Sequence, residues 1–294
     1  MPFLRERSGA WSPIKIAAFV GTLLPAFWLA YRIWDDDLGA RPVTEMIHFT
    51  GDWTVRILWI TLAVTPAARI FKQAKLLLIR RTLGVAAFAY IFVHFSLYIV
   101  DQKYILTTVA SEIVLRFYLT IGFIALAGLA ALAATSTDGM IRRMGARWNT
   151  LHNAIYFIAI LAAIHFLLQT KNDVSQPILM AGFLMWLLGY RIMQKRWREV
   201  SALRLTALAV IAAMLTAPLE TFWYHFRSNV PLDRIFFANF DFSYVIRPMW
   251  WVLAAGLTVV AAAYLWRFVP QRKPAARKAT VKPSSGATRV QSAS

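Results

Sequence analysis

The chain of 294 residues is 59% hydrophobic, has a mean hydropathy of +0.54, and is only 16% charged, against the roughly 25% that is usual in soluble domains. It contains no cysteine, which excludes disulfides, iron–sulfur clusters and thiolate-ligated haem. The formal net charge is +18, but the basic residues lie in short loops between apolar segments, so we interpret them as a signal of membrane topology rather than of nucleic-acid binding.

Eight apolar segments are long enough, or nearly so, to cross a hydrocarbon layer of about 30 Å as helices. Such runs are too long for barrel strands, so we predict an all-α integral membrane protein, a bundle of about eight transmembrane helices. The first segment is interpreted as a retained helix, because its apolar run is long and no small-residue cleavage site follows it. In chain order the segments are 14–33, 47–66, 82–100, 114–134, 149–169, 177–194, 203–221 and 247–268.

The basic residues alternate between the loops, which predicts the orientation of the chain. The second, fourth and sixth loops carry a strong excess of Lys and Arg, whereas the other loops are mixed or acidic. The tail after residue 270 holds six basic residues and no acid. The positive-inside rule therefore predicts a multi-pass membrane protein with both termini in the cytoplasm.

We divide the chain into four parts on this basis. Residues 1–13 form a cytoplasmic N-terminus, and 14–197 form a core of six transmembrane helices. Residues 198–269 add two further transmembrane helices joined by a periplasmic loop. The basic tail, 270–294, has no apolar periodicity and is predicted to be disordered in the cytoplasm.

Three histidines, His94, His152 and His165, lie within the apolar segments. An ionisable side chain inside a membrane is costly and points to a functional site, and histidine is a common axial ligand of haem iron. The predicted topology places His94 and His165 at similar depth, each about 20 Å from the cytoplasmic start of its helix at 1.5 Å per residue. This matched depth predicts one haem held between these two imidazoles near the outer face.

His152 lies near the cytoplasmic start of the helix that also carries His165, and no other histidine shares its level. A second haem on His152 would need a non-histidine partner, a water or an open position on the iron. Arg80 and Arg81 lie at that level and could pair with haem propionates. Thirteen positions rotate a helix by about 220°, so His152 and His165 do not share one face. The alternative is that these histidines only hydrogen-bond to neighbouring helices.

Two further groups of residues have either a functional or a structural interpretation. A basic cluster lies at the cytoplasmic end of the helix that carries His152 and consists of Arg142, Arg143, Arg147 and Trp148. It could bind a flavin phosphate or a quinone head group, or it could be a positive-inside cluster with an interfacial tryptophan. His48 and His225 fall near the membrane surface and are interpreted as structural. The sequence has no G-x-G-x-x-G motif and no soluble segment long enough for a nucleotide-binding domain, so the chain cannot draw on NADPH alone. Electrons for a bound haem would therefore come from a partner or from quinol.

Three stretches of the sequence carry a resemblance to a known family. The chain resembles the MsrQ family, the haem-binding membrane subunits of the protein-methionine-sulfoxide reductase system, within the ferric-reductase-like transmembrane superfamily. The likeness covers about residues 10–197. The stretches are GARPVTEMIHFTGDWTVRILWITLAVTP (39–66), RRTLGVAAFAYIFVHFSLYIVDQ (80–102) and TSTDGMIRRMGARWNTLHNAIYFIAILAAIHFLLQTK (135–171).

The resemblance implies b-type haem, one or two per chain, with His94, His152 and His165 as iron ligands. It also implies a bound FMN, a soluble periplasmic molybdenum-cofactor enzyme that reduces methionine sulfoxide as partner, and quinol or a cytoplasmic flavin reductase as electron donor. The region after residue 198 departs from the family's core of six helices.

The leading hypothesis is a transmembrane electron conduit, a non-catalytic electron-transfer subunit of an oxidoreductase complex. An alternative keeps the haem but reduces ferric iron or oxygen directly at the outer face. A third hypothesis is a proton-coupled transporter whose histidines relay protons.

Overall fold

The computed structural model describes residues 10–170, 173–197, 199–243 and 245–269, and every regular element within these ranges is a helix. The prediction of an all-α integral membrane protein is confirmed, since seven helical stretches are long and apolar enough to cross a membrane. The eighth long helix, α2 (Pro42–Ile70), is less apolar because it carries Glu45, Asp52, Arg56 and Arg69. The predicted basic tail lies outside the described residues.

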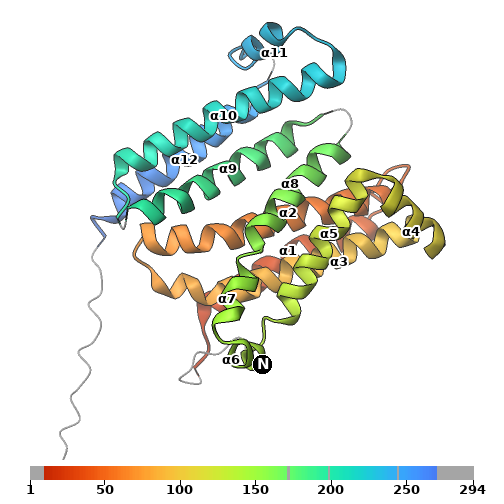
Figure 1. The fold of residues 1–294 in the computed structure, drawn as a ribbon, viewed down its shortest axis with the longest axis horizontal. Coiled ribbons are helices and arrows are strands. Elements are labelled where there is room, and N and C mark those ends of the chain that lie inside the picture. The colour runs from red at the N-terminus through yellow and green to blue at the C-terminus, as the bar shows by residue number, and fades with distance from the viewer. Residues whose placement is uncertain (1–9, 171–172, 198, 244, 270–294) are drawn as a thin grey trace, which may run out of the picture.

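Most predicted segments agree with the observed helices to within a few residues. Figure 1 shows the long helices as one bundle, with the short ones at its ends. A 3-10 helix, Ala74–Ile79, leads directly into α3. The remaining helices are α1 (Pro13–Trp34), α3 (Arg80–Asp101), α4 (Leu106–Leu115), α5 (Phe117–Ala134), α6 (Asp138–Met144), α7 (Ala146–His152), α8 (Ile155–Gln169), α9 (Ser175–Arg196), α10 (Ala202–Ser228), α11 (Leu232–Ala238) and α12 (Pro248–Trp266).

The predicted segment through His152 and His165 forms one candidate span, Ala146–Gln169, but its α-helix is interrupted at residues 153–154. His152 ends α7 and His165 lies on α8, with a tight turn between them. Within this turn Ala154 N–H donates to the Leu151 carbonyl at 3.0 Å, and Tyr156 N–H donates to the Asn153 carbonyl at 3.2 Å. These bonds span three residues rather than four, which tightens the helix locally. Asn153 and Ala154 keep right-handed helical dihedral angles, so the rotation calculated for a regular α-helix changes only locally.

The fourth predicted segment also begins differently. Arg116 is extended, with φ −105° and ψ 105°, and separates the short helix α4 from the spanning helix α5. The predicted span begins at residue 114, and the separate helix α4 is not predicted from the sequence. The short helices α6 and α11 were likewise not predicted.

The main hydrophobic core lies around α2, which contacts α3, α8 and α9. Its centre includes Leu58 and Ala159, both fully buried. Trp59 also forms a hydrogen bond between two helices: its indole N–H donates to the Met180 carbonyl of α9 at 2.7 Å. A buried tryptophan usually finds such a partner, because an unpaired N–H inside an apolar core is costly. The central place of α2 explains why it can be less apolar than its neighbours.

The two C-terminal helices, α10 and α12, pack on α9 and on each other. Small residues form the contact: Ala212 and Ala213 of α10 lie in one buried cluster with Val252 of α12. A side chain at Gly256 would collide with Ala209. Small residues let helix backbones approach closely in a membrane, where packing rather than the hydrophobic effect holds helices together. α9 thus joins this pair to the core around α2.

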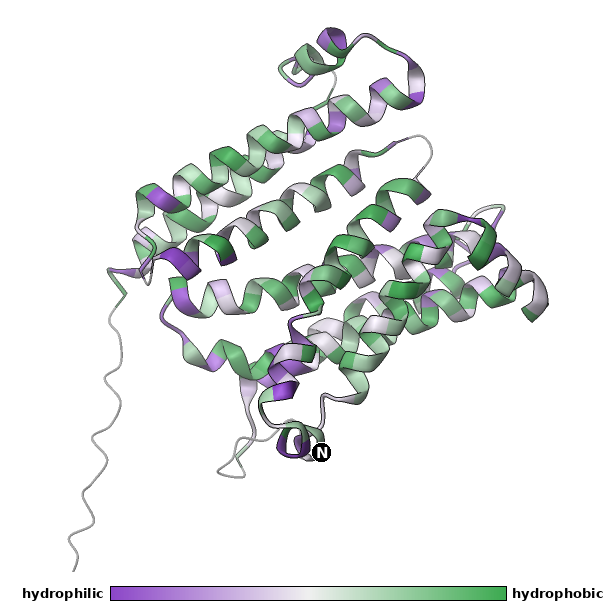
Figure 2. Ribbon diagram, viewed as in Figure 1, coloured by the Kyte–Doolittle hydropathy of each residue, from purple (hydrophilic) through white to green (hydrophobic). Residues whose placement is uncertain are grey.

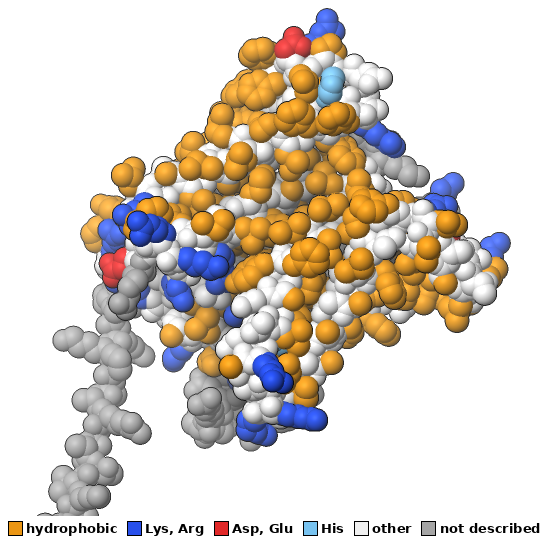
Figure 3. Space-filling view, in the orientation of Figure 1, with side chains coloured by type: hydrophobic (Ala, Val, Ile, Leu, Met, Phe, Trp, Pro, Cys, Tyr) orange, Lys and Arg blue, Asp and Glu red, His pale blue; other side chains and the backbone are white. Residues whose placement is uncertain are grey.

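The sides of the bundle are apolar. Figure 2 shows hydrophobic residues along most of the long helices, and Figure 3 shows their side chains over most of the visible surface, with many Lys and Arg side chains near helix ends. Phe27 is 67% exposed and Ile192 is 71% exposed, although both belong to spanning helices. Extended apolar surface of this kind is unusual in water and suits contact with lipid tails.

Candidate functional site

The structure brings His94 of α3 and His165 of α8 together. Their ring centroids lie 6.5 Å apart, and the ring planes are perpendicular, at 90°. Helix α5 packs against both α3 and α8, and this places the two side chains at one level. The juxtaposition expected from their matched depth is therefore observed, while their role as ligands stays a prediction. We call these two residues the outer histidine pair.

Each ring of the outer histidine pair is anchored to a neighbouring helix through Nδ1. His94 Nδ1 lies 2.8 Å from the Ile47 carbonyl oxygen of α2, and His165 Nδ1 lies 2.7 Å from the Tyr118 carbonyl oxygen of α5. A carbonyl oxygen only accepts hydrogen bonds, which assigns the proton and the donor role to Nδ1 in both rings. Each Nε2 then keeps its lone pair, the form in which imidazole binds a metal.

This geometry fits haem. With metal–imidazole bonds of about 2 Å, two imidazoles on opposite sides of one iron place their ring centres roughly 6 Å apart. The observed 6.5 Å agrees with that spacing. Among the described residues no group of three or more His, Cys, Asp or Glu side chains could hold a metal ion. A site with two imidazoles suits a metal that arrives with its other ligands, as haem iron does.

His152 has a different environment from the outer pair. Its ring stacks on Trp148 of the same helix, with centroids 3.8 Å apart and planes at 23°. Its Nδ1 lies 3.1 Å from the Trp148 carbonyl oxygen, and its Nε2 lies 3.5 Å from Ser136 Oγ. A contact of 3.5 Å is at the limit of a hydrogen bond, so Nε2 is only weakly engaged. The ring that packs against His152 is thus a tryptophan of its own helix.

The two arginines proposed from the sequence have different partners. Arg81 forms an ion pair with Asp138, with Nη1 and Oδ1 2.7 Å apart. Arg80, in contrast, acts electrostatically on His152 and on Arg191, and Arg69 also acts on Arg191. We call Arg69, Arg80 and Arg191 the inner arginine cluster. None of its guanidinium groups has a carboxylate within ion-pairing distance among the described residues.

Arg191 joins this cluster because of a proline in α2. Pro66 has no N–H, so the carbonyl of Leu62, one turn earlier, lacks its helical donor. Arg191 Nη2 donates to that carbonyl at 3.2 Å, and its guanidinium lies 5.7 Å from the ring centre of Tyr156. In the sequence Arg191 is one of the basic residues assigned to the sixth loop. Its place at the end of an apolar segment was the signal that could have identified it.

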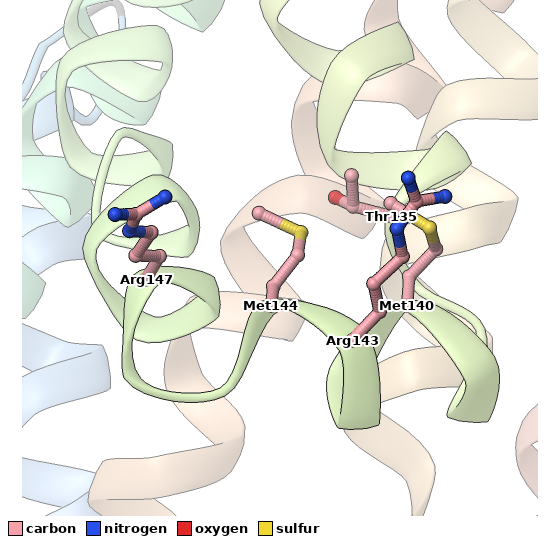
Figure 4. A pocket seen from close by; sticks show the side chains of 5 residues that line it. All are labelled: Thr135, Met140, Arg143, Met144 and Arg147. Carbon is pink, nitrogen blue, oxygen red and sulfur yellow. The ribbon is translucent and has the colours of Figure 1, made fainter.

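A cavity of about 610 Å³ opens at the corner between α5, α6 and α7. Figure 4 shows Met144 between Arg147 on one side and Arg143 with Met140 on the other, with Thr135 behind them. Two guanidinium groups beside two thioethers suit a flat, anionic ligand. Of the group weighed from the sequence, Arg143 and Arg147 line this cavity. Trp148 instead donates from Nε1 to the Thr135 carbonyl at 2.9 Å.

The two surface histidines have surroundings that agree with a structural interpretation. His48 is exposed near the start of α2. His225 lies near the end of α10, where its Nδ1 is 2.9 Å from the Val230 carbonyl oxygen. Asn229, with a φ of 53°, ends that helix. This contact connects the helix end to the following loop.

Comparison with known proteins places the chain in a family. Residues 50–163 match the family described as ferric reductase like transmembrane component. A protein of Xanthomonas campestris pv. campestris (strain 8004) is 42% identical over 200 residues, which cover 66% of this chain and 90% of that relative. A protein of Xanthomonas euvesicatoria pv. vesicatoria (strain 85-10) is 43% identical over 182 residues, covering 62% and 82%. Both are named protein-methionine-sulfoxide reductase heme-binding subunit MsrQ.

The chain belongs to the MsrQ family. The resemblance based on the three stretches is thereby confirmed. The range matched to the ferric-reductase-like family contains His94 and His152, and it ends two residues before His165. About a third of this chain lies outside its match with these MsrQ relatives. No solved structure matches the chain.

Proposed function

We propose that this protein is a haem-binding, non-catalytic electron-transfer subunit that carries electrons across the bacterial inner membrane to a periplasmic, molybdenum-dependent methionine-sulfoxide reductase. The observation that carries the proposal is the outer histidine pair, with ring centroids 6.5 Å apart and both Nδ1 atoms engaged elsewhere. It occurs in a chain of the MsrQ family, whose named members are heme-binding subunits of a protein-methionine-sulfoxide reductase.

The cofactor of this proposal is b-type haem, and His94 and His165 are the residues that would hold an outer haem. When bound, haem supplies a carrier for single electrons. The protein holds both imidazoles in the tautomer with a free Nε2, because Ile47 and Tyr118 accept from Nδ1. Both rings are half-buried among apolar helices, and the low polarity of these surroundings would contribute to the reduction potential.

An inner haem would be held by His152 and the inner arginine cluster. Carboxylates of haem propionates suit guanidinium partners, and Arg80 has no carboxylate partner among the described residues, whereas Arg81 is already paired with Asp138. FMN, which the family resemblance implies, would find an anion-binding cavity at Arg143 and Arg147. Both ligands belong to the cytoplasmic side in the topology inferred from the basic loops.

The proposed direction of transfer follows from that topology. His152 and the inner arginine cluster lie toward the basic loops, and the outer histidine pair lies toward the other side. Electrons would enter on the cytoplasmic side, from quinol or from a flavin reductase, and leave on the periplasmic side. The partner reductase would provide the chemistry on methionine sulfoxide, while this chain binds and orients the carriers.

The test is spectroscopic and kinetic. Purified protein should show b-type haem bands in its reduced-minus-oxidised spectrum. After reduction by quinol or by a flavin reductase, the haem should be reoxidised on addition of the periplasmic reductase with methionine sulfoxide. Equally fast reoxidation by ferric iron or oxygen alone would favour a direct reductase at the outer face. Colourless protein, made with an ample haem supply, would contradict haem binding and revive the transporter hypothesis.

His152→Ala tests the inner haem separately. We expect the variant to lose one haem signal while the outer haem keeps its spectrum, because His152 does not contact the outer histidine pair. Haem-to-protein ratio and redox titration measure this loss. Ser136→Ala removes only the 3.5 Å contact to His152 Nε2 and serves as the control. An unchanged haem content in His152→Ala would contradict an inner haem on this residue.

A further inference from the structure

The ring of His94 lies directly against a glycine of the neighbouring helix. The carbonyl that accepts from its Nδ1 belongs to Ile47, and Gly51 follows four residues later on α2. In a regular α-helix this is the residue whose N–H bonds that same carbonyl. A Cβ added at Gly51 would lie 3.0 Å from His94 Nδ1 and 3.1 Å from Cε1. The imidazole therefore reaches the carbonyl through the space that a side chain at Gly51 would occupy.

The same arrangement recurs around His165 on a different helix. Its Nδ1 is bonded to the Tyr118 carbonyl, and Gly122 follows four residues later on α5. A Cβ at Gly122 would lie 2.7 Å from both Nδ1 and Cε1 of His165. That separation is closer than carbon and nitrogen atoms tolerate, so the ring or the helix would have to move. Both histidines thus use a helix carbonyl that is followed, one turn later, by a glycine.

Helix geometry explains this spacing. Each Cα–Cβ bond in an α-helix tilts toward the N-terminus, so a side chain at position i+4 leans over the carbonyl of residue i. A carbonyl oxygen has two lone pairs, and the helical hydrogen bond uses only one of them. At Ile47 the hydroxyl of Thr50 also lies 3.1 Å from the carbonyl oxygen, but its shorter hydrogen bond, of 2.7 Å, goes to the Met46 carbonyl. Glycine at i+4 leaves the second lone pair open to a donor from a neighbouring helix. Any larger residue would cover it at least in part.

We propose that Gly51 and Gly122 are positioning residues for the two outer axial ligands: their missing side chains allow each imidazole to donate from Nδ1 to a helix carbonyl, which sets the ring orientation and the reduction potential of the iron. This inference rests on the proposed function. Donation from Nδ1 raises the basicity of an imidazole ligand, and a more basic ligand favours ferric over ferrous iron. Because each ring is anchored to a different helix, α2 and α5 together set the perpendicular planes.

Two other glycines provide matched controls. Gly128 lies on α5, as Gly122 does, and a Cβ there would meet Ile158 of α8 at 2.8 Å. Gly128→Ala therefore introduces a comparable clash at the same helix contact without touching a histidine. Gly84 of α3 is the mild control, because a Cβ there would meet only Thr61 Cγ2, at an ordinary 3.9 Å.

The experiment compares the purified full-length protein with its Gly51→Ala, Gly122→Ala, Gly128→Ala and Gly84→Ala variants. Electron paramagnetic resonance of the oxidised haem, the midpoint potential of the outer haem, and haem transfer to apomyoglobin are measured. We expect Gly51→Ala and Gly122→Ala to shift the resonance, raise the potential, and weaken haem binding by about 10- to 100-fold, as loss of an outer-shell partner of a ligating histidine does. Both controls should keep the wild-type resonance and potential.

Several outcomes would overturn the inference. A folded Gly51→Ala variant with the wild-type resonance and potential would do so. An equal shift in Gly128→Ala would also do so, because it would trace the effect to helix spacing. If Gly122→Ala does not accumulate in the membrane, the milder Gly51→Ala variant decides with the same measurements. Wild-type protein without haem would contradict the proposed function instead, so the two failures are distinguishable.

Discussion

His94→Ala and His165→Ala should each abolish the low-spin signal of the outer haem in the purified protein. Each substitution removes one of the two imidazoles whose rings lie 6.5 Å apart. The remaining histidine alone would leave the iron with an open axial position, which changes its spin state and weakens its retention. Optical and paramagnetic resonance spectra measure the loss. Electron delivery to the periplasmic reductase should fall to the background rate in both variants.

His48→Ala and His225→Ala are the controls for this prediction. Both are histidines near a helix end; His48 is exposed and His225 is half-buried. Neither should change the haem spectrum. If either His94→Ala or His165→Ala retained the wild-type low-spin spectrum, the outer histidine pair would not be the ligand set. A loss in one variant only would show that a different residue completes the coordination.

Arg247→Ala should cause the largest loss of stability. Glu220 on α10 is only 1% exposed, and its Oε1 pairs with Arg247 Nη1, at the start of α12, at 3.2 Å. Its Oε2 is buried and accepts no hydrogen bond from the described residues. Removing the arginine leaves an unpaired buried carboxylate, which typically costs about 3–5 kcal/mol. Thermal unfolding of the purified protein in detergent measures the effect as a lower melting temperature.

A double variant separates the charge from the lost packing. Glu220→Gln combined with Arg247→Ala removes both charges, so it should be clearly more stable than Arg247→Ala alone. Arg227→Ala removes an exposed charge near the end of the same helix and should change stability by less than about 0.5 kcal/mol. The haem spectrum should remain unchanged throughout, since the outer pair lies on α3 and α8. Equal destabilisation in the single and double variants would contradict the proposed cost of an unpaired charge.

The spanning helices could be predicted because membrane burial imposes a simple length and composition on each of them. The juxtaposition of His94 and His165 was also predictable, since orientation and rise per residue convert sequence position into depth. The interruption of the helix between His152 and Ile155 could not be predicted, because it depends on local hydrogen bonds that have no strong sequence signal. The helix α4 was missed for a similar reason: Arg116 interrupts an apolar run without glycine or proline.

Contacts between side chains far apart in the chain could not be predicted from the sequence. Arg191 reaches the Leu62 carbonyl only because α9 packs beside α2. That carbonyl lacks its helical donor because residue 66 is a proline. The pairing of Glu220 with Arg247 likewise requires the start of α12 to lie beside α10. A buried acid in an apolar segment was a signal for a partner, but it did not identify which arginine supplies it.

The class of the protein, its approximate number of spans and the predicted depth of its histidines could be inferred from the amino-acid sequence, because they follow from composition and from the rise of a helix along one axis. The way in which the helices rotate and approach one another is known only from the three-dimensional packing. It is this rotation that places Gly51 and Gly122 against the two rings and presents the carbonyls of Ile47 and Tyr118 to Nδ1. Side-chain orientation around a helix axis depends on packing between helices, which no single segment specifies.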